Sequence, residues 1–152
     1  MQVVTTSELA ASPEDVWARV ASLSGINDEL RPWLRMTAPR DAELTPEAVP
    51  LGRRWFRSWI LLLGVLPFDY VDLCVERIEP GRGFLERSRM LSARAWEHER
   101  TLDRLPEGGT RLTDRVRFAP RLPGTGRAHR AVIRAIFRHR HRRLRRALGK
   151  RA

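Results

Sequence analysis

The sequence predicts an α+β fold in which a curved antiparallel β-sheet wraps around a long C-terminal α-helix, with two short helices after the first strand. Three observations predict it. A helix-start motif follows an N-terminal strand pattern, β-type segments alternate with turn residues over 54–119, and an apolar stripe at helical spacing runs through 127–148. Helices segregated from an antiparallel sheet are typical of α+β proteins. At 152 residues the chain has the length of one domain, so we expect residues 1–152 to form a single unit.

The N-terminal part is expected to contain one strand and two short helices. Residues 2–9 are rich in β-branched side chains, which favour a strand. Residues 12–15 (SPED) combine a Ser N-cap, a Pro at the first helical position and two acids, so a helix begins there. Its buried stripe would consist of Val16, Trp17, Val20 and Leu23. After a break at Ser24-Gly25, a second short helix would carry Ile26, Leu30, Trp33 and Leu34.

The middle of the chain is expected to form an antiparallel meander. Residues 38–52 contain three prolines and one glycine, which indicates a loop with at most a short edge strand. The candidate strands that follow are 54–63, 69–79, 83–90, 94–104 and 110–119. The gaps between them are short and mostly marked by glycine or proline, as in hairpins.

The C-terminal segment holds the whole net charge of +11, because residues 127–152 carry eleven Arg or Lys and no acid. This segment could be a basic arm for nucleic acid or anionic lipid, or a helix with a charged back and a packed front. Its apolar residues recur at spacings of three and four, which favours the helix. They are Val132, Ile133, Ile136, Phe137, Leu144, Ala147 and Leu148. A helix over 127–148 would be about 33 Å long, with Thr125 as the expected cap and Gly149 as the expected stop.

The segment 96–118 determines which side chains face inward. If residue i pairs with residue 214 − i, one face brings Glu97, Glu99 and Asp103 opposite arginines, and each pair contributes a few tenths to about 1 kcal/mol. A slip by one residue would place like charges together and bury acids, so we expect the salt-bridged face to be outside. The inward face then consists of Trp96, His98, Arg100, Leu102, Leu112, Asp114, Val116 and Phe118.

Three inward residues, His98, Arg100 and Asp114, are polar in an otherwise apolar interior. Buried charges need partners, so Arg100 and Asp114 could form a structural ion pair beside a hydrogen-bonded His98. Alternatively, the three could orient an apolar ligand in a cavity, with His98 as a candidate acid–base catalyst. The candidate ligand-binding residues are therefore the eight inward residues together with Ile133, Phe137 and Arg140 of the last helix. Arg140 could lie at the edge of the stripe or reach the cavity and hold an anionic group.

Several segments resemble the START-like helix-grip superfamily (the SRPBCC group), which includes polyketide cyclases/dehydrases and lipid-transfer START domains. These are the SPEDVW start of the first helix, Arg-Pro-Trp at 31–33, Trp-Glu-His at 96–98 and the strand at 110–118. The resemblance implies a helix-grip fold with a hydrophobic cavity between sheet and helix. It implies no catalytic residue, because the group has no universal set.

The expected partner is a hydrophobic small molecule such as a lipid or polyketide, bound by a carrier or transformed by a cyclase/dehydratase-type enzyme. Contact of the arginine-rich helix with a membrane surface is a further alternative, and the apolar turn near Leu63, Val65 and Leu66 could gate the cavity or touch that membrane. No groove-reading motif favours nucleic acid. No ligand spacing predicts a metal or a cofactor. The lone Cys74, with no signal-peptide or membrane-span pattern, favours a cytoplasmic protein.

Overall fold

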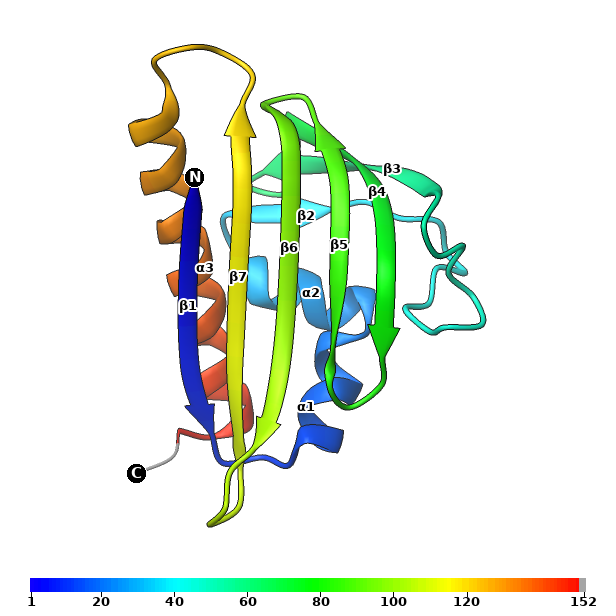
Figure 1. Cartoon of the computed structure of the whole chain (residues 1–152), viewed down its shortest axis with the longest axis vertical. Helices are drawn as coiled ribbons and strands as arrows, with labels where there is room; N and C mark the ends of the chain where they lie inside the picture. Colours follow the sequence, from blue (N-terminus) through cyan, green and yellow to red (C-terminus); the bar gives the residue numbers. More distant parts are fainter. Residues whose placement is uncertain (151–152) are drawn as a thin grey trace.

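The computed structural model describes residues 1–150 and contains one antiparallel sheet of seven strands in the order β1-β7-β6-β5-β4-β3-β2 (Figure 1). The strands are β1 (Gln2–Leu9), β2 (Leu34–Met36), β3 (Arg54–Leu62), β4 (Leu66–Glu79), β5 (Gly83–Met90), β6 (Ala93–Arg104) and β7 (Thr110–Pro120). The helices are α1 (Pro13–Val20), α2 (Leu23–Leu30) and α3 (Gly126–Leu148). The predicted meander and the α+β class are confirmed.

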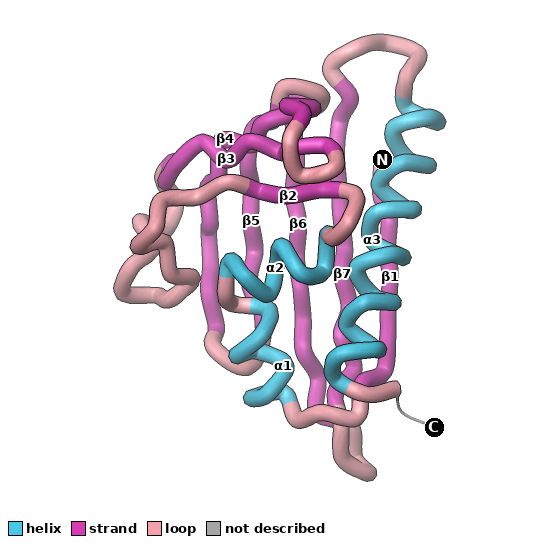
Figure 2. Tube along the Cα trace, turned by 180° about the vertical axis from the view of Figure 1, so that it is seen from behind, coloured by secondary structure: helices cyan, strands magenta, loops and turns pink. Residues whose placement is uncertain are grey.

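The sheet curls around the helices. In Figure 1, β1 and β7 stand in front of α3, and β2 and β3 run across behind the upper part of the sheet. Seen from behind in Figure 2, α1 and α2 lie beside α3 on the same concave side. This is the helix-grip arrangement that the resemblance implied.

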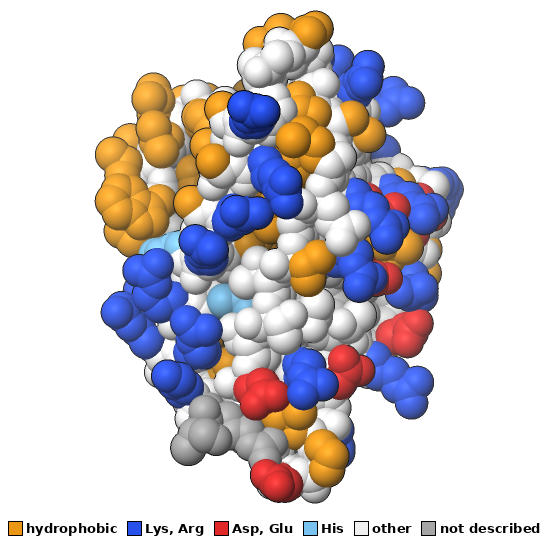
Figure 3. Space-filling view, turned by 60° about the vertical axis from the view of Figure 1, so that its left-hand side comes forward, with side chains coloured by type: hydrophobic (Ala, Val, Ile, Leu, Met, Phe, Trp, Pro, Cys, Tyr) orange, Lys and Arg blue, Asp and Glu red, His pale blue; other side chains and the backbone are white. Residues whose placement is uncertain are grey.

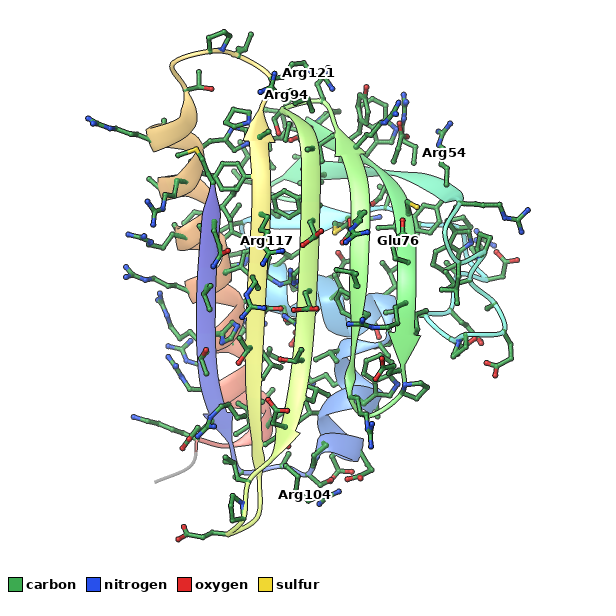
Figure 4. The ribbon with its side chains drawn as sticks, in the orientation of Figure 1. Arg54, Glu76, Arg94, Arg104, Arg117 and Arg121 are labelled. Atoms are coloured by element: carbon green, nitrogen blue, oxygen red, sulfur yellow. The ribbon has the colours of Figure 1, made fainter. Side chains whose placement is uncertain are left out.

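The β6–β7 register is the predicted one, with Trp96 opposite Phe118 and Arg100 opposite Asp114. The outer face carries Glu97–Arg117 and Glu99–Arg115 ion pairs, each at 3.1 Å. Asp103 also lies opposite Arg111, as predicted, but the Arg111 guanidinium contacts Glu8 of the neighbouring β1. Figure 4 shows Arg117 on this outer face, with α3 behind the sheet.

Two apolar clusters fill the space between the sheet and α3. The lower cluster consists of Leu9, Val16, Val20, Leu102, Leu112 and Leu144. The upper cluster consists of Val3, Val116, Phe118, Ile133 and Phe137. Arg100 and Asp114 lie between these clusters along β6 and β7, so their charges are surrounded by apolar packing.

The second helix differs from its prediction at both ends. It begins at Leu23 with Ser22 as its N-cap, so Gly25 lies inside the first turn, where its N–H donates to Ser22 Oγ. It ends at Leu30 because Pro32 excludes Arg31 from helical backbone, leaving Arg31 extended with φ −59° and ψ 147°. Trp33 therefore lies outside the helix, and Leu34 begins β2.

The predicted last helix is confirmed as α3, which ends at Gly149 with a positive φ of 81°. Thr125 does not cap it through its side chain, because the Thr125 hydroxyl donates to the carbonyl of Leu122. Val132 of the predicted stripe is 48% exposed, since it lies where α3 and the sheet separate.

Candidate functional site

A buried carboxylate, Asp114 of β7, is the centre of a polar network between the two apolar clusters. Its Oδ1 accepts hydrogen bonds from His98 Nε2 at 2.7 Å and from Arg100 Nε at 2.8 Å. Its Oδ2 accepts from Arg100 Nη2 at 2.7 Å and from His141 Nε2 at 2.9 Å. Burial by itself would raise the pKa of the Asp114 carboxyl, but the charge of Arg100 holds that pKa well below its usual range. Asp114 is therefore an anion that orients two imidazoles.

Arg100 is fully buried and is held by acids from two elements. Besides Asp114, its guanidinium donates to Glu29 of α2, from Nη2 to Oε1 at 3.0 Å and from Nη1 to Oε2 at 3.3 Å. Burial opposes the charged form, but Asp114 and Glu29 together raise the pKa of Arg100. A buried charge of this kind is tolerated only when its donors are satisfied. This ion pair is consequently part of the framework that joins α2 to the sheet.

His141 of α3 connects the network to the first strand. Its Nδ1 lies 2.7 Å from Ser7 Oγ, while its Nε2 faces Asp114. Since a carboxylate only accepts hydrogen bonds, Nε2 carries a proton, and in the neutral ring Nδ1 accepts from the Ser7 hydroxyl. The helix is thereby tied to β1 and β7 by a chain of buried hydrogen bonds.

His98 of β6 contacts the Asp114 network on one side and lines both cavities described below on the other. Because its Nε2 donates to Asp114, its Nδ1 is the nitrogen that points toward Glu86 of β5, with Oε2 at 3.8 Å. The rings of Phe84 and Phe137 flank the imidazole edge-to-face at 5.2 and 5.0 Å. An Asp-oriented imidazole with one free nitrogen can take or give a proton.

Glu86 is a further acid that lies beside the Asp114 network, near His98. Ser88 Oγ donates to its Oε1 at 2.6 Å, and burial raises the pKa of the Glu86 carboxyl although His98 and Arg140 oppose this. The carboxyl is thus biased toward its neutral form, which can donate a hydrogen bond as well as accept one.

A cavity of about 320 Å³ lies between the upper part of the sheet and α3. Its wall is mainly apolar and includes Ile60, Val71, Met90, Trp96, Ile133 and Phe137. The polar residues Glu86, His98 and Arg140 gather where this cavity meets a second one of about 100 Å³, because all three line both. A mostly apolar chamber with a few convergent polar groups is typical of small-molecule sites.

The cavity opens to solvent beside the β3–β4 turn, because the exposed Phe68 and Val132 line it. The turn itself exposes Leu63, Val65 and Leu66, whose exposed fractions are 61%, 79% and 60%. Figure 3 shows an apolar cluster beside a row of arginine side chains on this side of the molecule.

The structure brings only some of the candidate residues to the chamber. Trp96, His98, Ile133, Phe137 and Arg140 line the larger cavity, and Arg100 lines the smaller one. The other candidates line neither cavity, because they are enclosed in the apolar clusters or, for Asp114, in the polar network. These are Leu102, Leu112, Asp114, Val116 and Phe118.

Sequence reasoning missed Glu29, Glu86 and His141. Each had a signal: Glu29 follows Ile26 by three residues, Glu86 alternates with Phe84 and Met90, and His141 lies four residues after Phe137. These spacings place all three side chains on inward faces. Within residues 1–150 no three His, Cys, Asp or Glu side chains are grouped to hold a metal ion, and none of the described helices is long and apolar enough to span a membrane.

The sequence profile of a family described as a domain of unknown function (DUF8410) matches residues 7–148. Protein CV1439 from Chromobacterium violaceum is structurally similar, with a TM-score of 0.73 and 15% identity over 99% of both chains. A START superfamily protein from Mycobacterium smegmatis matches with a TM-score of 0.68 and 13% identity, over 97% of this chain and 96% of that one. DynU16, from the dynemicin biosynthetic locus, matches with a TM-score of 0.61 and 17% identity, over 99% of this chain and 49% of its own. Comparison with the curated proteins yields no match.

Proposed function

The chain belongs to the DUF8410 family and has a START-like helix-grip fold, and from this we propose that it binds a hydrophobic small molecule in the cavity between the sheet and α3. The single observation that supports this most is the chamber of about 320 Å³, with an apolar wall and a polar end. Its volume lies at the lower end of the range for small-molecule pockets. A lipid or polyketide fragment of modest size is the class of ligand that suits it.

Binding of a neutral environment-sensitive dye such as Nile red tests this proposal. Ile136 lines the cavity and is half-buried, so Ile136→Trp should fill the chamber and weaken dye binding at least tenfold. The matched control is Leu148→Trp, a half-buried position on the same helix that does not line this cavity. Equal dye affinity in both variants, or no dye binding by the wild type, would contradict the proposal.

A second candidate function is acid–base catalysis by His98, favoured by the 2.7 Å hydrogen bond from its Nε2 to Asp114. This bond sets the tautomer and leaves Nδ1 as the base facing the chamber, with Glu86 nearby. A cyclase or dehydratase reaction needs such a group to move a proton on a bound carbonyl compound.

Imidazole ¹H–¹⁵N NMR tests this tautomer without a substrate. We expect the His98 signal to be that of a ring protonated at Nε2, and Asp114→Asn to disturb it. The control is His139→Gln, a histidine of the same helix as His141 that lines neither cavity, and this variant should leave the signal unchanged. A wild-type ring protonated at Nδ1 would rule out the proposed base.

A route to the chamber is suggested by the surface around its mouth. We infer that the β3–β4 turn, with Leu63, Val65 and Leu66, contacts anionic lipid while exposed arginines of α3, such as Arg130 and Arg134, face the headgroups. Apolar side chains that insert and basic side chains that stay at the surface are the two features of interfacial binding.

Vesicle co-sedimentation tests this contact. Wild type should bind vesicles that contain phosphatidylglycerol, in a salt-dependent manner, and should bind pure phosphatidylcholine weakly. Val65→Asp should reduce binding at least fivefold, whereas Leu51→Asp, at an exposed position outside the turn, should not. Equal loss in both variants would refute a role for the turn.

A further inference from the structure

Arg140 is a buried cation whose hydrogen-bonding capacity the protein does not use fully. It is 9% exposed, and among residues 1–150 its Nε–H donates to no acceptor within hydrogen-bond geometry. The nearest carboxylate oxygen, Glu29 Oε1, lies 3.4 Å from that Nε. Glu29 is already bound by Arg100 through two hydrogen bonds. Arg140 is therefore not needed to satisfy Glu29.

The position of Arg140 directs it at the chamber rather than at solvent. It lines both cavities, together with Glu86 and His98. Its guanidinium carbon lies 4.9 Å from the centre of the Phe137 ring, which leaves the donors on its edge free to point elsewhere. A planar guanidinium in an apolar wall is well suited to bind a carboxylate or another oxyanion.

The surrounding charges favour an anion over a cation at this end. Arg100 is bound by both Asp114 and Glu29, whereas Arg140 has, among the described residues, only the shared Glu29 at 3.4 Å, and the Glu86 carboxyl is biased toward the neutral form by burial. A neutral Glu86 can donate to a ligand oxygen beside Arg140. An ammonium group would instead meet the Arg140 charge at close range.

We propose that the chamber takes an apolar molecule carrying one carboxylate or similar anionic oxygen, and that Arg140 binds this oxygen. This inference rests on the proposed small-molecule binding and names the chemical class of the ligand. The apolar tail would lie against Trp96 and Ile133, toward the mouth beside Val132.

A head-group series with a constant tail tests the inference. The test measures the affinity of wild type, Arg140→Met and Arg138→Met for decanoate, decanol and decylamine. Each compound is used below its micelle concentration, and its affinity is obtained from displacement of Nile red. Arg138 is an exposed arginine of the same helix, so its variant removes the same charge without touching the chamber. We expect wild type and Arg138→Met to bind decanoate at least tenfold more tightly than decanol, which corresponds to about 1.4 kcal/mol. Arg140→Met should bind decanoate and decanol equally.

Arg140→Lys provides a second variant, since it keeps the cation and should keep a preference for decanoate. Wild type alone gives an independent readout, because the carboxyl pKa of ¹³C-labelled decanoate, followed by NMR, should fall on binding. An unchanged decanoate preference in Arg140→Met, a preference for decanol or decylamine in wild type, or a raised carboxyl pKa would each overturn the inference. Failure of Nile red to bind wild type would instead refute the proposed function itself.

Discussion

Replacing Asp114 by Asn is the most direct test of the buried network. The carboxylate accepts four hydrogen bonds, two from Arg100 and one each from His98 and His141. In Asn one oxygen becomes an NH₂ group, which would face donors whichever way the amide is turned. At least two charge-assisted hydrogen bonds are lost, each contributing about 1.5–3 kcal/mol.

This loss agrees with the about 3–5 kcal/mol typical of breaking a buried ion pair from one side. We therefore expect the free energy of unfolding to fall by about 4 kcal/mol and Tm by roughly 8–16 °C, at ~2–4 °C per kcal/mol for a domain of this size. Urea unfolding followed by far-UV circular dichroism measures it. The control is Glu8→Gln, which breaks a half-exposed ion pair with Arg111 and should cost less than about 1 kcal/mol.

The stability difference between wild type and Asp114→Asn should also change with pH in a predictable direction. Because the folded-state pKa of Asp114 is depressed, its contribution is present above the unfolded Asp pKa of about 3.9 and is lost as pH falls through the folded pKa. The stability difference between wild type and Asp114→Asn should be constant from pH 5 to 8 and shrink below about pH 4. A difference under 1 kcal/mol at pH 7, or one that does not shrink in acid, would refute the reasoning.

Three further changes have defined outcomes. Glu86→Gln should gain stability relative to wild type as pH rises. The pKa of Glu86 is raised in the folded state, so wild type loses the stability contributed by the protonated carboxyl as pH rises through that folded-state pKa. A difference in Tm between the two proteins that does not change with pH would contradict this. Gly83→Ala should lose several kcal/mol in urea unfolding, since its Cβ would lie 1.9 Å from the Arg100 carbonyl oxygen at a φ of +145°, and near-normal stability would show that the strand can shift. Ser12→Ala should cost about 1 kcal/mol by removing the cap on the Asp15 N–H, while Ser12→Asp should restore it; a neutral Ala variant would exclude a role for the cap.

The β6–β7 hairpin was predictable because its determinants are local. Its two strands are joined by a short turn, one face carries charge pairs and the other apolar pairs, and a slip exchanges the two faces. The Arg100–Asp114 pair followed directly, since these residues face each other across the strands. The long α3 was predictable for the same reason, from the spacing of its apolar residues.

The other partners of Arg100 and Asp114 were not predictable from the local sequence. Glu29 is 71 residues from Arg100, and His141 is 27 residues from Asp114, so their meeting depends on how α2 and α3 dock. The spacing of Glu29 and His141 could have placed them on inward faces, but it could not have said what they would contact. The end of α2 was missed because the restriction from Pro32 outweighed the apolar pattern of Trp33 and Leu34.

The inward side chains of β6, β7 and α3 can be identified from the sequence, because alternation and helical spacing are properties of the local backbone. Which of these inward residues fill a core and which line a void depends on how the elements pack together. Leu102 and Leu112 meet α1 and α3 and are packed, whereas Trp96 and Ile133 lie where the curled sheet and α3 separate. The separation of sheet and helix depends on all the elements that pack between them, so no single segment of sequence contains it.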